Sequence, residues 1–331
     1  MAHIEPFRGI RPKKELAAKV AAPPYDVLDS KEARAMVQGN PFSFLHVGKP
    51  EIDLPAGTSL YSPEVYAKGL ENFTALRRQG VLFQDPGECF YVYKQVWREH
   101  TQVGLVAAAS CQDYLDDIIK KHELTREDKE NDRMRHIETL QSQTGPVFLT
   151  YRRRDAVDRL IGQVLAGAPE YDFATDDGVH HTFYVVSDPA MVDAIQREFA
   201  AIDRLYVADG HHRSAAATRI KVKRQQANPA HDGTEEYNFF LSVIFPDNQM
   251  KILPYNRVVK DLHGQTPEQF WSRVAEKFTV TGRGQKEPRR PHEFCLYMDK
   301  TWFTLEAKPE TFDPRDPIAS LDASILQTQL L

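Results

Sequence analysis

The stretch that decides the fold runs Leu205-Tyr206-Val207-Ala208-Asp209-Gly210-His211-His212-Arg213-Ser214-Ala215-Ala216-Ala217. Its pattern predicts a short buried strand over 205–208, a tight turn at Asp209-Gly210, and a helix that begins at the histidines. The first turn of a helix carries free backbone N–H groups and the positive end of the helix dipole. Phosphate and carboxylate bind well at such a place. We therefore expect an anion site for a phosphorylated small molecule.

Each polar residue of this turn has a chemical use. Asp209 would repel phosphate, so we expect it to hold a metal ion or to orient a substrate hydroxyl or amine. Gly210 permits a positive φ and a close backbone approach. Arg213 can bind phosphate oxygens bidentately, and His211 and His212 can donate to anions or ligate a metal. The alternative is an ordinary Asp-Gly turn with capping histidines, which leaves the crowding of polar groups unexplained.

A second polar motif begins at Lys121 and continues His122-Glu123-Leu124-Thr125. Thr125 with Asp128 predicts a capping box, so a helix should begin after Thr125. His122 and Glu123 would then precede that helix, with Glu123 as general base and His122 as its neighbour or as a phosphate ligand. Thr125 and Lys129 join the candidate phosphate-binding or nucleotide-binding residues. The alternative for the helix itself is a solvated, charge-compensated surface.

Weaker pocket candidates are Thr144, in a loop before a predicted strand, and Asn256 with Arg257, after a predicted hairpin. The identity of any metal ligand stays open. Several nucleotide-site motifs are absent from the sequence. It has no P-loop, no G-x-G-x-x-G after a strand, no protein-kinase motif set and no H-E-x-x-H. If the protein binds a nucleotide, it must do so through a motif other than these.

Composition limits the class of protein. The chain has 331 residues, a net charge of −5 and three cysteines without C-x-x-C spacing. The acidic balance makes nucleic acid an unexpected partner, and the cysteines do not form a zinc-finger or disulfide pattern. No apolar run reaches the roughly 18–20 residues that span a membrane. We expect a cytoplasmic protein.

Periodicity predicts an α/β protein in which strands and helices interleave. Helices are predicted near 30–38, 63–79, 126–140, 156–165, 189–199, 267–278 and from about 317. Strands are predicted at 89–96, 102–110, 146–151, 181–186, 205–208, 238–245 and 250–253, with a further hairpin across Asp299-Lys300. Because several neighbouring strands form hairpins, the sheet should be mixed rather than doubly wound and parallel.

Further motifs point to a known family. They are Pro6-Phe7-Arg8-Gly9-Ile10-Arg11-Pro12, Ala22-Pro23-Pro24-Tyr25-Asp26-Val27, Thr144-Gly145-Pro146 and Tyr255-Asn256-Arg257-Val258-Val259. With the two polar motifs, nearly the whole chain resembles an uncharacterised family catalogued as domain of unknown function ten-fifteen. Its members run longer at the C-terminus, and the final apolar stripe here ends without a cap, so we expect a chain that stops short of the family's end.

That family is similar, more remotely, to the archaeal ADP-dependent free serine kinase and to a siderophore-pathway serine kinase of the ParB/sulfiredoxin-like superfamily. In that superfamily a glycine-centred turn ending in Arg binds nucleotide phosphates, and Asp209–Arg213 matches it. The serine kinases use an acidic residue to activate the serine hydroxyl, for which Glu123 is the best match. His211 and His212 stand where a sulfiredoxin needs Cys, so that chemistry is not expected.

The combined prediction is a ParB/sulfiredoxin-like core over residues 100–262. Residues 1–99 should form an N-terminal wrap and helix-hairpin region, and residues 263–331 a C-terminal α/β appendage. The expected function is an ATP- or ADP-dependent, Mg²⁺-assisted phosphotransferase of serine or a similar hydroxylated metabolite. The alternatives are a nucleotide-binding regulatory protein without catalysis and a ParB-like DNA-associated module.

Overall fold

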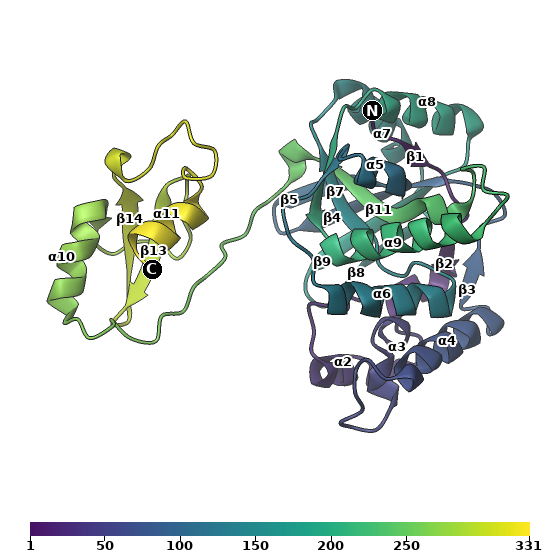
Figure 1. The fold of residues 1–331 in the computed structure, drawn as a ribbon, viewed down its shortest axis with the longest axis horizontal. Helices are drawn as coiled ribbons and strands as arrows, with labels where there is room; N and C mark the ends of the chain where they lie inside the picture. Colours follow the sequence, from purple (N-terminus) through teal and green to yellow (C-terminus); the bar gives the residue numbers. More distant parts are fainter. The chain divides into compact units, whose positions relative to one another are not determined.

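The computed structural model describes residues 1–331 as two compact units, residues 1–251 and residues 252–331 (Figure 1). The larger unit is built on a nine-stranded sheet in the order β6-β10-β7-β11-β5-β4-β9-β8, with β1 paired to β5. Its strands are β1 (Ile4–Glu5), β4 (Phe90–Trp97), β5 (His100–Ser110), β6 (Ile119–Lys120), β7 (Val147–Tyr151), β8 (Tyr171–Ala174), β9 (Val179–Val186), β10 (Leu205–Asp209) and β11 (Phe239–Pro246).

The sheet is mixed, as the sequence predicts. β10 runs parallel to β6 and antiparallel to β7, and β7 runs parallel to β11. From β11 through β5, β4, β9 and β8 every neighbouring pair is antiparallel. Hairpins therefore build one end of the sheet, whereas crossover connections build the end that contains β10.

Helices cover the sheet in successive layers (Figure 1). Helix α9 (His211–Ala227) packs against β7 and β11, α6 (Glu127–Leu140) packs on α9, and α4 (Pro63–Arg78) packs on α6. Helix α7 (Asp155–Leu165) packs against β4 and β9 with α8 (Pro189–Ala200) beside it. The main core lies between these last two helices and the sheet, where Leu105, Leu149, Val157, Ile195 and Phe199 are buried together.

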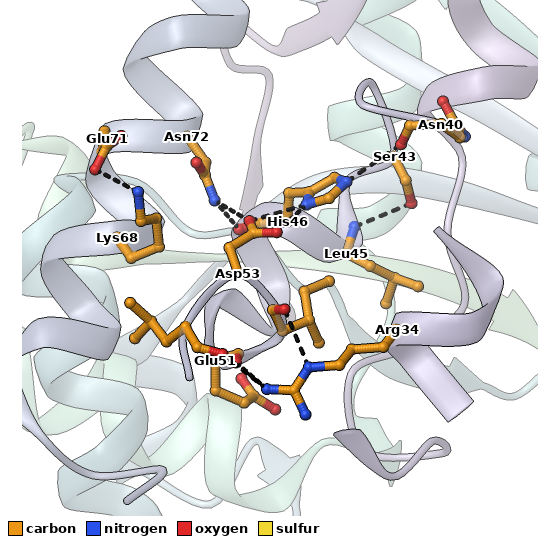
Figure 2. A network of polar contacts seen from close by, with 12 residues as sticks. Arg34, Asn40, Ser43, Leu45, His46, Glu51, Asp53, Lys68, Glu71 and Asn72 are labelled. Carbon is orange, nitrogen blue, oxygen red and sulfur yellow. Dashed lines mark hydrogen bonds and ion pairs between the residues drawn. The ribbon is translucent and has the colours of Figure 1, made fainter. Parts of the chain in front are cut away.

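The N-terminal residues are ordered, as expected for a wrap. They form β2 (Ile10–Pro12), α1 (Ala17–Val20), α2 (Ser30–Met36) and α3 (Leu45–Gly48), and β2 pairs with β3 (Leu82–Gln84). Around α3 a network of polar contacts joins His46, Asp53 and Asn72 (Figure 2). These contacts fix the loops of a segment whose prolines exclude long regular elements.

The sequence of α4 places Val65, Leu70, Phe73 and Leu76 roughly along one stripe, which predicts that all four are buried. Val65, Phe73 and Leu76 are buried, but Leu70 is 39 % exposed. On the same turn Gly69 is buried instead, and a Cβ there would approach Pro50 at 3.2 Å, so α4 lies close to its neighbours at this point.

The predicted hairpin after β11 is wrong in its second half. Residues 250–262 contain no strand, and Ile252 is 95 % exposed. The reason lies in the sheet: β11 is paired with β5 on one side and with β7 on the other. No hydrogen-bonding edge of β11 remains for a returning strand.

The smaller unit contains a three-stranded sheet in the order β12-β14-β13. Its elements are α10 (Pro267–Lys277), β12 (Phe278–Thr281), β13 (Glu293–Met298), β14 (Thr301–Ala307) and α11 (Asp322–Gln329). The hairpin across Asp299-Lys300 is confirmed, while the last helix begins at Asp322 rather than near 317. Phe278, Leu305 and Ile325 form the core of this unit.

The two compact units are divided differently from the three predicted segments. A boundary after residue 99 would fall inside the hairpin of β4 and β5, whose residues pair from Trp97↔His100 to Tyr91↔Val106. Both strands share one sheet, so residues 1–99 and the following residues lie in the same unit. No helix combines the length and the apolar character needed to cross a membrane.

Candidate functional site

The two polar motifs meet because of the strand order at one end of the sheet. β6 and β10 are parallel neighbours, with Leu205 opposite Ile119 and Tyr206 opposite Lys120. Parallel strands end at the same edge of a sheet, where ligands often bind in α/β proteins. His122 and Glu123 follow the end of β6, and His211 follows the end of β10 with Gly210 between. Sequence reasoning missed β6, although Ile118-Ile119 was its apolar signal.

The turn between β10 and α9 depends on glycine. Gly210 has φ of +94°, a left-handed conformation that other residues adopt at a cost. A Cβ at this position would lie 3.1 Å from Arg213 Nε. The helix begins at His211 as predicted, whereas β10 extends one residue past the predicted strand and ends at Asp209.

His211 is the buried centre of the cluster. Its side chain is 3 % exposed, and its Nδ1 lies 3.3 Å from Glu123 Oε2. The rings of His211 and His122 meet edge-to-face with 4.4 Å between centroids. Burial, with a smaller effect from His122, lowers the pKa of His211 below its usual value. The imidazole is therefore neutral at neutral pH, with a carboxylate facing one ring nitrogen.

Glu123 and His122 are exposed at the entrance of the cluster, before α6 begins at Glu127. The predicted capping box is wrong: Arg126 is the N-cap residue and no side chain caps the helix. Instead the Thr125 hydroxyl donates to Glu130, which also accepts from Arg219 NH1 at 2.8 Å. The link to α9 replaces the local cap, so tertiary contacts fix the start of α6.

Arg213 is held by partners within the protein. Its guanidinium donates to the Asp209 carboxylate and to the Pro146 backbone carbonyl, and it lies 3.7 Å from Asp26 Oδ2. The Arg213 side chain is 11 % exposed, and its Nε is buried without a hydrogen-bond acceptor. Because β7 is antiparallel to β10, its first residues lie beside the last residue of β10, which brings Pro146 to Arg213.

The Tyr25-Asp26 segment also reaches this region. The Arg133 guanidinium lies 4.1 Å from the Tyr25 ring centroid, and Arg133 NH2 donates to Asp132 at 2.7 Å. Burial raises the pKa of Tyr25. Asp26 lies beside Arg213, as given above, so the N-terminal wrap contributes a carboxylate to the site. In the sequence, this segment was marked by a polar pair after two prolines and by its place among the family motifs.

The chain matches the family model described as "Protein of unknown function (DUF1015)" over residues 4–324. It belongs to that family. The resemblance expected from the sequence motifs is therefore confirmed for the family, which assigns no activity. No curated protein and no solved structure matches the chain in the corresponding comparisons.

The remaining candidates of this DUF1015 protein are placed as follows. His212 Nε2 accepts from the Arg126 backbone N–H at 3.2 Å, which joins α9 to the residue before α6. Lys129 donates to the Tyr61 hydroxyl at 2.8 Å. His212 therefore contacts the residue before α6, whereas Lys129, in the first turn of α6, contacts the N-terminal region. Thr144 is half-buried in the loop before β7.

Asn256 and Arg257 belong to the smaller unit of the DUF1015 chain. Both are exposed, and the Arg257 guanidinium lies 4.3 Å from the Tyr255 ring centroid. The residues that the larger unit brings together are His122, Glu123 and the turn at 209–213. Their charges, an open carboxylate beside free helix N–H groups, suit an acid–base or anion-binding role.

Proposed function

We propose that the protein is a small-molecule phosphotransferase that uses ATP or ADP with Mg²⁺. One observation supports this most: Glu123 Oε2 lies 3.3 Å from His211 Nδ1, at the N-terminus of α9. A candidate general base thus lies next to a helix end that favours anions. Phosphoryl transfer needs little more from a protein than positioning and charge neutralisation.

The phosphate would bind to the first turn of α9. No protein acceptor is hydrogen-bonded to the backbone N–H groups of His211, His212 and Arg213, and the first bond of the helix runs from Ser214 N to Gly210 O. These N–H groups point out of a helix of 17 residues, whose dipole adds to their attraction for anions. Arg213 positions the turn through its contact with Asp209.

The transfer step needs one proton acceptor. Glu123 would take the proton of the acceptor hydroxyl while that oxygen forms a bond to the terminal phosphorus. The bond from phosphorus to the leaving oxygen breaks, and its electron pair remains on the nucleotide. His211, neutral and buried, orients the Glu123 carboxylate. Burial of His211 is what keeps this pair in place, since Glu123 itself is 60 % exposed.

Mg²⁺ prefers carboxylate oxygens, and Asp209 is the residue that fits. Its side chain is 65 % exposed and contacts Arg213 through Oδ2. The second carboxylate oxygen, Oδ1, has no protein partner. Bound there, the ion would neutralise charge on the phosphates.

The acceptor we propose is serine or a similar hydroxylated metabolite. This choice rests on the resemblance of the two motifs to free serine kinases, with Glu123 in place of their acidic residue. The ParB/sulfiredoxin-like core implied by the same resemblance remains a prediction. A small hydroxylated acceptor also suits a base that is open to solvent rather than enclosed.

The test is to incubate the full chain with radiolabelled ATP or ADP, Mg²⁺ and a panel of hydroxy amino acids. We expect labelled product, and a loss of about 10²–10⁴-fold in its rate for Glu123→Gln. Glu127→Gln is the matched control, because Glu127 is an exposed glutamate four residues further along. It should retain the wild-type rate.

Absence of product with every acceptor would overturn the proposal, as would an unchanged rate in Glu123→Gln. Nucleotide binding that persists in Glu123→Gln without turnover in the wild type would instead identify a regulatory protein.

A further inference from the structure

The geometry points to a transition-metal site in the same cluster: we propose that His122, Glu123 and His211 bind a divalent ion such as Zn²⁺. One ligand atom from each of these residues lies within 4.8 Å of the other two. His122 and Glu123 lie in the segment that follows β6, and His211 begins the helix that follows β10, so the parallel pairing of these two strands brings the three residues together. The three residues come from two segments that are far apart in the sequence.

The spacing of two ligands already fits a tetrahedral ion. Zn²⁺ binds imidazole nitrogen and carboxylate oxygen at about 2.0–2.2 Å, which places tetrahedral ligand atoms roughly 3.3–3.5 Å apart. His211 Nδ1 and Glu123 Oε2 are 3.3 Å apart. His122 is exposed, and one of its ring nitrogens lies within 4.8 Å of the ligand atoms of the other two residues.

The donor set selects the class of ion. Two imidazoles with one carboxylate suit Zn²⁺ and neighbouring transition metals, whereas Mg²⁺ and Ca²⁺ favour oxygen ligands. Three protein ligands also leave a fourth position, which is typical of catalytic rather than structural zinc. Glu123 is 60 % exposed, so this fourth position faces solvent and is accessible to a ligand.

The helix dipole opposes a cation here, but weakly. The N-terminus of α9 carries a partial positive charge, whose effect on an exposed charge is small and falls off within the first turn. The negative charge of Glu123 attracts a cation directly. The dipole thus lowers the affinity of the site without removing it.

The role of the ion rests on the proposed function. In a phosphotransferase, the fourth position would take an oxygen of the acceptor or of the phosphate. Glu123 would hold the ion through the carboxylate oxygen that faces His211, Oε2, and its other oxygen would take the proton of the acceptor hydroxyl. The metal site itself depends only on the three residues and their spacing.

The test measures metal binding to the full chain without nucleotide or acceptor. After treatment with a chelator and its removal, Zn²⁺ is titrated calorimetrically, and Co²⁺ is added separately as a spectroscopic probe. We expect one Zn²⁺ per chain, a visible spectrum typical of tetrahedral Co²⁺, and much weaker heat with Mg²⁺.

Variants assign the ligands. His122→Ala and His211→Ala should each weaken Zn²⁺ binding by at least about tenfold. His122 is exposed, so His122→Ala keeps the test decisive if His211→Ala does not fold. His180→Ala is the matched control, because His180 is an exposed histidine beside a carboxylate, Asp172, in strands β9 and β8 of the same unit. It should bind Zn²⁺ as the wild type does.

No stoichiometric Zn²⁺ binding, or equal loss in His180→Ala and His122→Ala, would overturn the metal assignment. Phosphate transfer without Zn²⁺ binding would contradict the metal site alone. Zn²⁺ binding without any transfer would contradict the phosphotransferase alone.

Discussion

Two histidine–carboxylate pairs in the larger unit differ in how fully they are hydrogen-bonded. Near α3, His46 Nδ1 lies 2.9 Å from both oxygens of Asp53, and its Nε2 lies 3.2 Å from the Asn40 carbonyl (Figure 2). Asn72 Nδ2 donates to the same carboxylate at 2.7 Å. At the end of β10, by contrast, Glu123 has one contact to His211, at 3.3 Å.

This difference separates a structural pair from a reactive one. The hydrogen-bonding groups of the His46–Asp53 pair already have protein partners that close a loop, so little capacity is left for a ligand. The Glu123–His211 pair keeps carboxylate capacity facing solvent. A long contact in the free protein is what a base or ligand shows when it tightens only with a bound partner.

A third imidazole extends the comparison and carries the largest expected stability effect. His136 in α6 is buried, its Nε2–H donates to the Val47 carbonyl, and no carboxylate pairs with its ring. Burial, with a smaller effect from Arg133, lowers the pKa of His136 from 6.5 to about 4, against the opposing effects of the hydrogen bond to Val47 and of Asp132. The unfolded chain therefore binds this proton more readily between those two pH values.

Stability linked to His136 is fully present above pH 6.5 and is lost as the pH falls toward 4. The loss amounts to roughly 3 kcal/mol, from 1.36 kcal/mol for each pKa unit. Denaturant unfolding at several pH values should show a shallower acid dependence for His136→Gln, whose amide can still donate to Val47. Parallel pH dependence in the variant and the wild type would contradict the prediction.

The comparison itself is tested by truncating the two carboxylates. Asp53→Ala leaves His46 and Asn72 without their shared acceptor, and it should cost about 2 kcal/mol in the free energy of unfolding. Glu123→Ala should change stability by less than about 0.5 kcal/mol, because the side chain is exposed with one long contact. If urea unfolding showed equal losses of free energy for the two variants, both pairs would stabilise the fold to the same degree.

The smallest expected effect concerns the turn that presents the open pair. Gly210→Ala and Gly178→Ala both force alanine into a left-handed conformation, at φ of +94° and +80°, which costs about 1 kcal/mol. A Cβ at Gly210 also meets Arg213 at 3.1 Å, whereas one at Gly178 meets nothing within 4 Å. We expect Gly210→Ala to cost roughly 0.5 kcal/mol more in thermal unfolding. Equal stability losses in the two variants would show that the Arg213 side chain moves aside from the new Cβ at no cost.

Long periodic segments were predictable from the sequence. α6, α7 and α8 lie within a residue or two of their predicted ranges, as do β4, β5 and β10. Their apolar spacing is strong enough to decide the element locally. The same is true of the turn at Gly210, where glycine permits the left-handed backbone that the change from strand to helix requires.

The misses share one cause, which is dependence on distant neighbours. β6 has two residues and exists only because β10 lies beside it. The expected strand at 250–253 fails because β11 is already paired on both sides. Thr125 does not cap α6, since its hydroxyl is used by Glu130. In each case the local pattern was compatible with two outcomes, and pairing partners chose between them.

The sequence by itself determined that a strand, a glycine turn and a helix follow one another at 205–227, because propensity and backbone freedom act over a few residues. Only the tertiary structure decided what faces that turn. The parallel pairing of β6 with β10 sets Glu123 beside His211 across 88 positions, from residue 123 to residue 211. Contacts over such a separation come from the order of strands in the sheet, which no local pattern encodes.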